Sequence, residues 1–396
     1  MGEGIFAPQV NPGRLAMKIT SVEMHVAPMS DSWLTDKIVA NPMSRYPEYF
    51  EQRSSWYGRM TAGVAEITVE DGTVGYGFVG GGRANAARTI LDDQFRSMLV
   101  GKNCFDSELI FDQLTRASVF FGHGGIPMAA ISGIDIALWD LKGKLMGKPV
   151  YDLLGGKGTE DLSPYLTTWS PRAIEEFGIN DVKIAVPFGP SHGEAGMKRN
   201  EIIVSEAREL IGDEGFIALD CYMAWDVPYA IEMAKRLRPY QIAWIEEPVM
   251  PEDVEGYRRI SGAVSCRVSG GEHSFTLPQF ARLIIEGGID LVQPDIYRAG
   301  GITGLRRIAS IARAHNVELI CHGVGSPTYH FLISNGPVLS PRCEYLDIYD
   351  GGSATWVLTD DPRPKEGRLA LSSLPGFGYD INRAAFEEGS SVAPIW

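Results

Sequence analysis

The sequence predicts an α/β fold in which a barrel of parallel strands and outer helices follows a second, smaller domain. Between Phe216 and Gly323, short apolar runs end in a polar side chain at steps of 26, 26, 23 and 27 residues, and the intervals can hold amphipathic helices. A buried parallel strand reads as a continuous apolar run, and a returning helix completes a unit of roughly 30 residues. The chain has 396 residues, whereas such a barrel needs about 250, so the N-terminal part is left for the second domain.

The five apolar runs end in groups that can bind a metal or move a proton: Asp220, Glu246, Glu272, Asp295 and His322. In a closed barrel the strand ends point into one shared mouth, so we expect these groups to converge. Three carboxylates placed together repel one another unless a cation lies between them, and oxygen ligands with room for water suit Mg²⁺. A single acidic residue at a strand end is usually a helix cap or a surface charge, but five groups in register argue against that reading.

These runs resemble the enolase superfamily and, within it, the mandelate racemase-like sugar-acid dehydratases. The motifs that carry the resemblance are Leu219-Asp220, Trp244-Ile-Glu-Glu-Pro248, Gly271-Glu272-His273, Gln293-Pro-Asp295 with Gly300-Gly301, and His322-Gly323. The resemblance implies that Asp220, Glu246 and Glu272 hold Mg²⁺, and that Asp295 with His322 forms a catalytic dyad.

The resemblance extends over nearly the whole chain from about Met17 and implies a domain organisation. A modified TIM barrel of the (β/α)7β type is expected at residues 156–364. An α+β capping domain is expected at residues 17–155, completed by a C-terminal segment at about 365–396. Residues 1–16 are expected to form a disordered leader.

Composition excludes several classes of protein. The net charge of −14 argues against nucleic acid as a partner, because phosphate binding needs a basic surface. No apolar run approaches the roughly 18 residues of a membrane span, and no signal peptide is recognisable, so we expect a cytoplasmic enzyme with no membrane partner. The five cysteines form no Cys-x-x-Cys pair, and reduced thiols fit the cytosol.

The N-terminal part begins with strand-like alternation at residues 17–27 and a predicted hairpin at 63–78 that turns at Asp71-Gly72. Between them, residues 30–60 are aromatic, basic and without periodicity, and we call them the lid segment. Aromatic and basic side chains together are suited to closing over a polar, anionic ligand, so we expect this segment to cover the active site. The alternative is a surface loop that packs on a neighbouring subunit. Arg53 is the candidate substrate contact, and Asn41-Pro-Met-Ser-Arg-Tyr46 resembles the rhamnonate dehydratase group.

Helices are predicted near 84–100 and 106–118 and at 127–146, where Asp135 and Asp140 are expected to be structural. The first two barrel strands are predicted near 163–168 and 181–186. Family members often carry Lys-x-Lys in the second strand, but this chain has Lys183-Ile184-Ala185, which disfavours a racemase with two bases. Lys183 remains a candidate for contact with a substrate carboxylate or a metal ligand, with a structural salt bridge as the alternative.

Three further candidates lie at later strand ends. Alternation places Tyr222 on the side of Asp220, so we expect it to contact substrate. His273 follows Glu272 and is expected either at the rim of the site or in a structural role. In the eighth strand, at residues 343–348, Glu344 resembles the family carboxyl that hydrogen-bonds the developing enediolate and must hold a proton to do so. Asp347 is the alternative residue for this role. More outer helices are predicted near 197–212, 227–238, 277–287 and 302–315.

The implied chemistry is dehydration of an aldonate such as L-rhamnonate or L-lyxonate. A divalent ion offsets the charge that develops when a carbon next to a carboxylate loses its proton. Asp295 can hold one nitrogen of His322 and raise its basicity, so His322 would remove the C2 proton and return it to the departing 3-hydroxyl, through an enediolate. A racemase or epimerase, or a non-catalytic barrel protein, is the alternative. The flat faces of such barrels predict a homo-oligomer, an octamer as in relatives.

Overall fold

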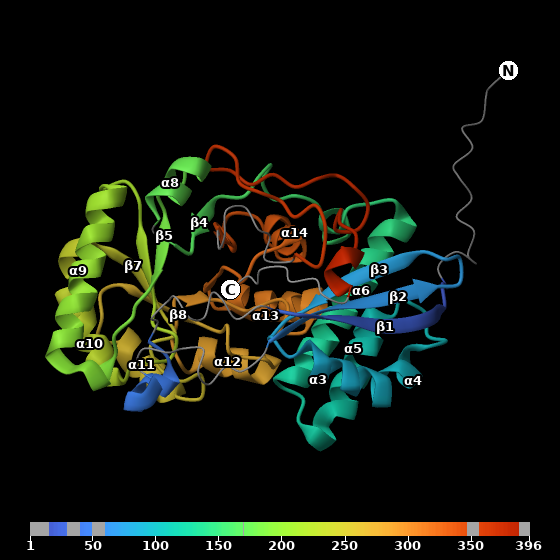
Figure 1. Ribbon diagram of the computed structural model, residues 1–396, viewed down its shortest axis with the longest axis horizontal. Coiled ribbons are helices and arrows are strands. Elements are labelled where there is room, and N and C mark those ends of the chain that lie inside the picture. Colours follow the sequence, from blue (N-terminus) through green and yellow to red (C-terminus); the bar gives the residue numbers. More distant parts are fainter. Residues whose placement is uncertain (1–15, 30–39, 50–59, 169, 347–355, 388–396) are drawn as a thin grey trace.

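The computed structural model describes residues 16–29, 40–49, 60–168, 170–346 and 356–387. The barrel lies on one side of the molecule and a three-stranded sheet with its helices lies on the other (Figure 1). Eight parallel strands are ordered β10-β9-β8-β7-β6-β5-β4-β11. The strands are β4 Pro164–Leu166, β5 Val182–Ala185, β6 Ile217–Asp220, β7 Ile242–Glu246, β8 Arg267–Gly270, β9 Leu291–Val292, β10 Glu318–Leu319 and β11 Cys343–Tyr345.

One helix follows each of the first seven barrel strands, which confirms the predicted (β/α)7β arrangement. The helices are α8 Pro171–Phe177, α9 Gly193–Ile211, α10 Val227–Arg236, α11 Val254–Ser261, α12 Leu277–Ile285, α13 Gly301–Ala314 and α14 Ser326–Asn335. Each helix returns the chain to the same end of the sheet, because parallel neighbours require a crossover. The carboxyl ends of all eight strands therefore share one edge.

The two ends of the sheet, β10 and β11, are joined by contacts outside the regular ladder. The backbone N–H of Leu319 donates to Leu339 O at 2.7 Å. The backbone N–H of Gly323 donates to Glu344 Oε2 at 2.8 Å. The second contact links the strand end that carries His322 with the candidate carboxyl of the last strand.

The N-terminal part contains an antiparallel sheet of β1 Ile19–Pro28, β2 Thr61–Val69 and β3 Val74–Val79. The hairpin turns as predicted, since Gly72 has φ +86° and Asp71 Oδ1 accepts from the N–H of Thr73 at 2.9 Å. The helices are α3 Ala84–Ile90, α4 Arg96–Leu99, α5 Ser107–Ala117 and α6 Ile126–Met146, with a π-helical turn at Leu91–Phe95 between α3 and α4. The predicted domain boundaries stay a prediction.

Helix α6 packs closely on β3 and against the barrel. A Cβ atom at Gly77 would lie 2.0 Å from Gly133 O, so only glycine permits this approach. On the barrel side, Asp135 Oδ2 accepts from the N–H of Thr303 at 2.9 Å, near the start of α13. Asp135 is therefore structural, as predicted, and its burial raises its pKa to about 7.

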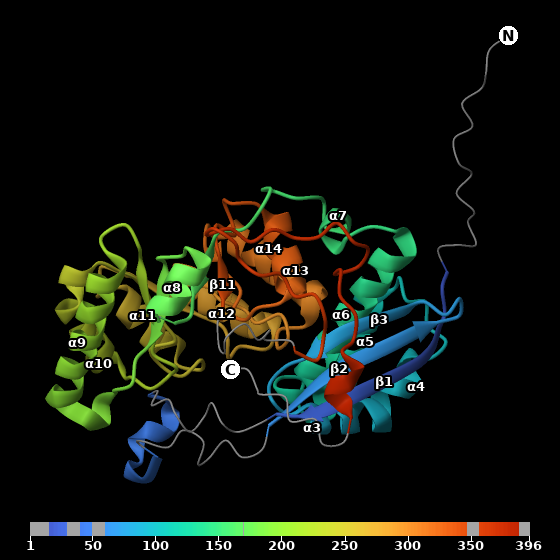
Figure 2. The same ribbon diagram turned by 45° about the horizontal axis from the view of Figure 1, so that its top comes forward.

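Asp140 of α6 ties the C-terminal segment to the sheet. Its two oxygens accept from the N–H groups of Phe377 and Tyr76, each at 3.0 Å. The hydroxyl of Tyr379 donates to Tyr76 O at 2.8 Å. Figure 2 shows this segment, in red, running from the barrel to the three-stranded sheet, and the structural role predicted for Asp140 is confirmed.

The described part of the lid segment lies against the barrel mouth. The N–H of Ala40 donates to Val186 O at 3.1 Å, and the Arg45 guanidinium lies 3.6 Å from Asp226 Oδ2. Arg53, Asp347 and the leader residues 1–15 lie outside the described residues. None of the described helices is long and apolar enough to cross a bilayer.

Candidate active site

The polar groups predicted at the strand ends converge. Asp220 and Glu246 are direct partners in the register of β6 and β7, and Asp295 and His322 form a parallel bridge just beyond β9 and β10. The His322 Nδ1 atom lies 3.0 Å from Asp295 Oδ2, and His322 Nε2 lies 3.4 Å from Glu272 Oε1. The predicted dyad geometry is therefore present, and it adjoins a predicted metal ligand.

Lys183 is buried between two carboxylates. Its Nζ lies 2.7 Å from both Glu246 Oε1 and Glu344 Oε1, and its side chain is only 1% exposed. Burial alone would lower the pKa of Lys183, but the two carboxylates raise it well above its usual value. Lys183 thus forms salt bridges inside the barrel mouth, one of them with the predicted metal ligand Glu246, and its contact with substrate stays a prediction.

Two residues that the sequence analysis did not single out orient Glu246. The Gln293 amide donates to Glu246 Oε2 at 2.7 Å, and the Trp244 indole donates to the same oxygen at 3.2 Å. With Lys183 on Oε1, these donors leave one position free of the roughly four lone-pair positions of a carboxylate. Trp244 precedes Glu246 by two residues on a strand, so the period of two could have indicated its direction.

Burial and neighbouring carboxylates raise the pKa of Asp220 and of Glu246. Burial, together with Glu272 and Glu247, raises the pKa of Asp220 to about 6 despite the nearby charge of Lys183. Burial, together with Asp220, also raises the pKa of Glu246. Such a cluster is stabilised by a cation, and hard carboxylate oxygens fit Mg²⁺.

Glu272 has oxygens available for such an ion. Its Oε1 lies 3.4 Å from the Arg298 guanidinium, 3.4 Å from His322 Nε2 and 3.9 Å from His273 Nε2. These are loose contacts compared with the 2.7 Å pairs around Lys183. Asp220, Glu246 and Glu272 are buried carboxylates that repel one another, which is consistent with a cation between them, and their role as metal ligands stays a prediction.

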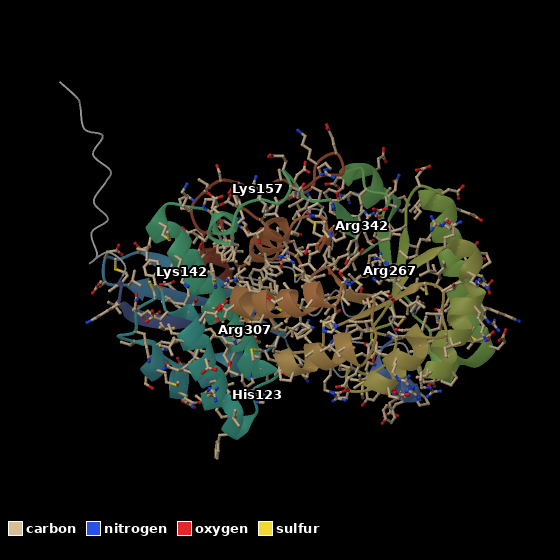
Figure 3. The ribbon with its side chains drawn as sticks, turned by 180° about the vertical axis from the view of Figure 1, so that it is seen from behind. His123, Lys142, Lys157, Arg267, Arg307 and Arg342 are labelled. Carbon is tan, nitrogen blue, oxygen red and sulfur yellow. The ribbon has the colours of Figure 1, made fainter. Side chains whose placement is uncertain are left out.

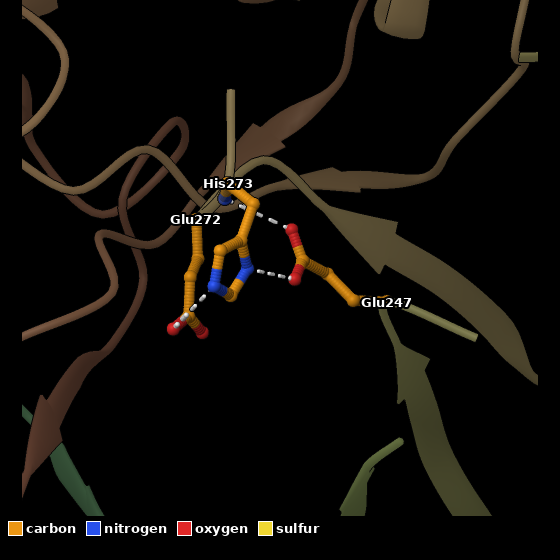
Figure 4. A group of neighbouring side chains, drawn as sticks. All are labelled: Glu247, Glu272 and His273. Atoms are coloured by element: carbon orange, nitrogen blue, oxygen red, sulfur yellow. Dashed lines mark hydrogen bonds and ion pairs between the residues drawn. The ribbon is translucent and has the colours of Figure 1, made fainter. Parts of the chain in front are cut away.

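Among the described residues, the group of three metal-ligating side chains whose ligand atoms lie within 4.8 Å of one another is Glu247, Glu272 and His273 (Figure 4), and not the predicted set of Asp220, Glu246 and Glu272. Glu247 and His273 already satisfy each other, because His273 Nδ1 lies 2.5 Å from Glu247 Oε2 and the His273 N–H donates to Glu247 Oε1 at 3.1 Å. Burial would raise the pKa of Glu247, but His273 lowers it to about 2. We therefore assign to Glu247 and His273 the role of holding Glu272 in place.

Tyr222 lies against His273, with ring centroids 5.1 Å apart in an edge-to-face arrangement. The strand alternation used to predict the direction of Tyr222 does not extend to it, because β6 ends at Asp220 and Tyr222 has φ +44°, so its contact with substrate stays a prediction. Met223 and Glu247 also have positive φ, +59° and +39°. Such strained residues cluster at functional sites, which supports this end of the barrel as the active site.

The dyad is electrostatically linked to Glu272. Burial would lower the pKa of His322, but Glu272 and Asp295 raise it to about 9. The Arg298 Nε lies 3.2 Å from Asp295 Oδ2, and this charge, acting against burial, keeps the pKa of Asp295 below its usual value. Arg298 was missed in the sequence because no periodicity marks a residue in the turn between β9 and α13.

Glu344 differs from expectation in its protonation. It was expected to hold a proton, but Thr167 Oγ1 and Lys183 donate to its Oε1 and the Gly323 N–H donates to its Oε2. Burial would raise the pKa of Glu344, but Lys183 and His322 lower it to about 2. In this arrangement Glu344 is an ionised acceptor, because every one of these neighbours is a donor.

Two family models match the chain. Residues 18–155 match the mandelate racemase/muconate lactonizing enzyme N-terminal domain, and residues 170–385 match the enolase C-terminal domain-like model. An L-rhamnonate dehydratase of Saccharopolyspora erythraea is 36% identical over 361 residues, covering 89% of this chain and 91% of the relative.

Solved structures give the same result. The crystal structure of rhamnonate dehydratase from Gibberella zeae complexed with Mg has a TM-score of 0.87 and 33% identity, with 96% of this chain and 97% of that chain covered. A second crystal structure of the Gibberella zeae enzyme has a TM-score of 0.88, also at 33% identity, and covers 98% of this chain and 97% of that chain.

Proposed function

This chain belongs to the mandelate racemase/muconate lactonizing enzyme family of the enolase superfamily, and from that premise we propose that it dehydrates a sugar acid. It is a hydro-lyase that uses Mg²⁺, as the similarity to rhamnonate dehydratases and to an Mg-complexed structure supports. The observation that carries the proposal is the His322–Asp295 pair, at 3.0 Å, beside a cluster of buried carboxylates.

We assign the metal to Asp220, Glu246 and Glu272. When bound there, Mg²⁺ supplies positive charge that offsets the charge developing on a substrate carboxylate. Gln293 and Trp244 hold Glu246 in place by donating to its Oε2, and Lys183 balances its charge. Glu247, through the backbone N–H of His273, fixes the strand end that carries Glu272.

His322 moves the proton. Asp295 contacts Nδ1 of the imidazole, which leaves Nε2 to face the substrate. Neutralising Glu272 removes one of the charges that hold His322 protonated, so that Nε2 can accept the proton from C2. The same nitrogen then gives the proton to the departing 3-hydroxyl, and the C3–O bond breaks as the C2–C3 double bond forms. The 3-hydroxyl leaves as water, and tautomerisation of the remaining enol gives a 2-keto-3-deoxy acid.

The second barrel strand supports a single base. Ala185 is the direct partner of Asp220 in the register of β5 and β6, so a methyl group stands where many family members place a second lysine. A methyl group cannot exchange a proton, and racemisation through two bases is therefore disfavoured. Loss of the 3-hydroxyl on the face of His322 remains as the economical reaction.

The substrate class follows from the site and the relatives. A five- or six-carbon aldonate has the carboxylate, the acidic C2–H and the 3-hydroxyl that this reaction needs, and L-rhamnonate, L-lyxonate and L-mannonate are the candidates. The stretch Asp31–Asp36 of the lid segment contains no histidine, unlike the corresponding stretch of rhamnonate dehydratases. All three aldonates therefore stay candidate substrates, because the lid contacts that would recognise C5 and C6 differ. Arg53 of the lid segment is the proposed contact to the distal carbons, and Tyr222 stays a candidate substrate contact.

The test is a panel of monoacid and diacid sugars incubated with the protein and Mg²⁺, assayed for 2-keto-3-deoxy product. We expect product from at least one aldonate and none after chelation of the metal. Turnover of diacids alone would overturn the aldonate assignment. Loss of optical rotation without keto product would replace the dehydratase by a racemase.

A further inference from the structure

His322 begins a segment with little intrinsic conformational preference. Gly323 and Gly325 have φ +82° and +109°, and glycine adopts such angles freely but loses the most entropy when it is fixed. The position of the imidazole therefore depends on contacts that hold this segment. One of them is the hydrogen bond from the Gly323 N–H to Glu344.

A second contact comes from Tyr297, which binds Asp295 of the dyad and the segment that follows His322. The Tyr297 hydroxyl donates to Val324 O at 2.8 Å, two residues after His322. Its backbone N–H donates to Asp295 Oδ1 at 2.7 Å. Tyr297 is 2% exposed, so water does not compete for either bond.

The other side of Tyr297 packs against the N-terminal sheet. Its ring meets the edge of Phe78 of β3, with centroids 4.9 Å apart and planes at 83°. A Cβ atom at Gly80 would lie only 2.7 Å from the Cβ of Tyr297. The end of β3 thus limits where Tyr297 can sit.

We propose that Tyr297 is a positioning residue that sets the placement of His322 relative to Asp295, and that β3 acts on the dyad through it. The inference rests on the proposed function for its kinetic consequences, but the geometry itself does not. Displacement of a catalytic group by about 1 Å can cost on the order of 100-fold in rate. A single hydroxyl that anchors a glycine-flanked segment can have an effect of that kind.

The main variant is Tyr297→Phe, which removes the hydroxyl and keeps the ring and the backbone N–H. We expect kcat to fall by about tenfold or more, with KM and bound Mg²⁺ within about twofold of wild type. The matched control is Tyr379→Phe, which removes another buried hydroxyl that donates to a backbone carbonyl at 2.8 Å, outside the site. We expect Tyr379→Phe to lose stability without loss of kcat.

A second variant, Gly80→Ala, adds a Cβ atom directly after β3 that would clash with the Cβ of Tyr297, and it alters no site residue. We expect it to lower kcat in the same way. This variant also tests the proposal if Tyr297→Phe does not fold. A wild-type kcat together with unchanged ring ¹⁵N signals of His322 in folded Gly80→Ala would overturn the proposal.

A readout independent of turnover separates this proposal from the proposed function. The chain has seven histidines, so the ring ¹⁵N signals of His322 can be assigned by their loss in His322→Asn. We expect these signals to shift in Tyr297→Phe and to stay in place in Tyr379→Phe. If the wild type dehydrates no sugar acid, the proposed function fails while the shift still supports positioning. Unchanged signals and unchanged kcat in Tyr297→Phe would refute the positioning role.

Discussion

Replacing Lys183 with Met tests the electrostatics of the barrel mouth. The methionine keeps most of the volume but removes the charge that lies 2.7 Å from both Glu246 and Glu344, which are fully buried. Breaking a buried ion pair by removing one partner typically costs about 3–5 kcal/mol. If about 1 kcal/mol corresponds to a shift of about 2 °C for a chain of this size, the melting temperature should fall by about 6–10 °C.

The assay is thermal unfolding with chelator and with Mg²⁺. The deficit of Lys183→Met relative to wild type should be largest with chelator and smaller with Mg²⁺, because the added cation replaces part of the missing charge. A deficit that is independent of Mg²⁺ would show that Lys183 does not act on the metal ligands. A melting temperature equal to that of wild type in chelator would refute the ion-pair account altogether.

The matched control is Lys142→Met. Lys142 is also buried, but it donates to Ser107 Oγ at 2.5 Å in the N-terminal half of the molecule (Figure 3). Its loss should lower the melting temperature by an amount that does not change with Mg²⁺. A Mg²⁺-dependent deficit in this control would show that the assay does not report on the barrel mouth.

Further predictions concern the metal, the pH dependence and assembly. Glu246→Gln should reduce the Mg²⁺ content by elemental analysis, and Glu247→Gln should retain it; the reverse result would favour the group around His273. Burial lowers the pKa of His330 from 6.5 to about 3, so as the pH falls below 6.5 the unfolded chain binds a proton that the folded chain does not. Between pH 7 and about pH 4.5, wild type should therefore lose about 2–3 kcal/mol more unfolding free energy than His330→Gln, and equal losses in denaturant titrations would contradict this. Small-angle scattering should show a homo-oligomer. A monomer would contradict the predicted assembly but not the predicted fold or function.

The sequence was sufficient for the barrel because its signals are periodic. Apolar runs of parallel strands recur with the intervening helices, and the last residue of each run is placed by the closure of the sheet. Asp220, Glu246, Glu272, Asp295 and His322 could be found for this reason. The resemblance to a family supplied their roles, which spacing alone does not give.

Residues that act across the site were harder to predict. Arg298 and Tyr297 lie in the turn between β9 and α13. Their partners, Glu272 and Val324, follow other strands and come close only in the folded barrel. The direction of Tyr222 could not be taken from strand alternation, because β6 ends two residues before it and its φ is positive. The protonation of Glu344 was wrong because its donors, Lys183 and the Gly323 N–H, come from other strands.

The most direct test of the account is turnover by His322→Asn. The wild type with Mg²⁺ should convert an aldonate to 2-keto-3-deoxy product, and the variant should lose on the order of 10²–10⁴-fold in kcat while binding the same amount of Mg²⁺. Retention of turnover within about twofold of wild type by a folded, Mg²⁺-loaded His322→Asn would contradict the central claim that this imidazole moves the C2 proton.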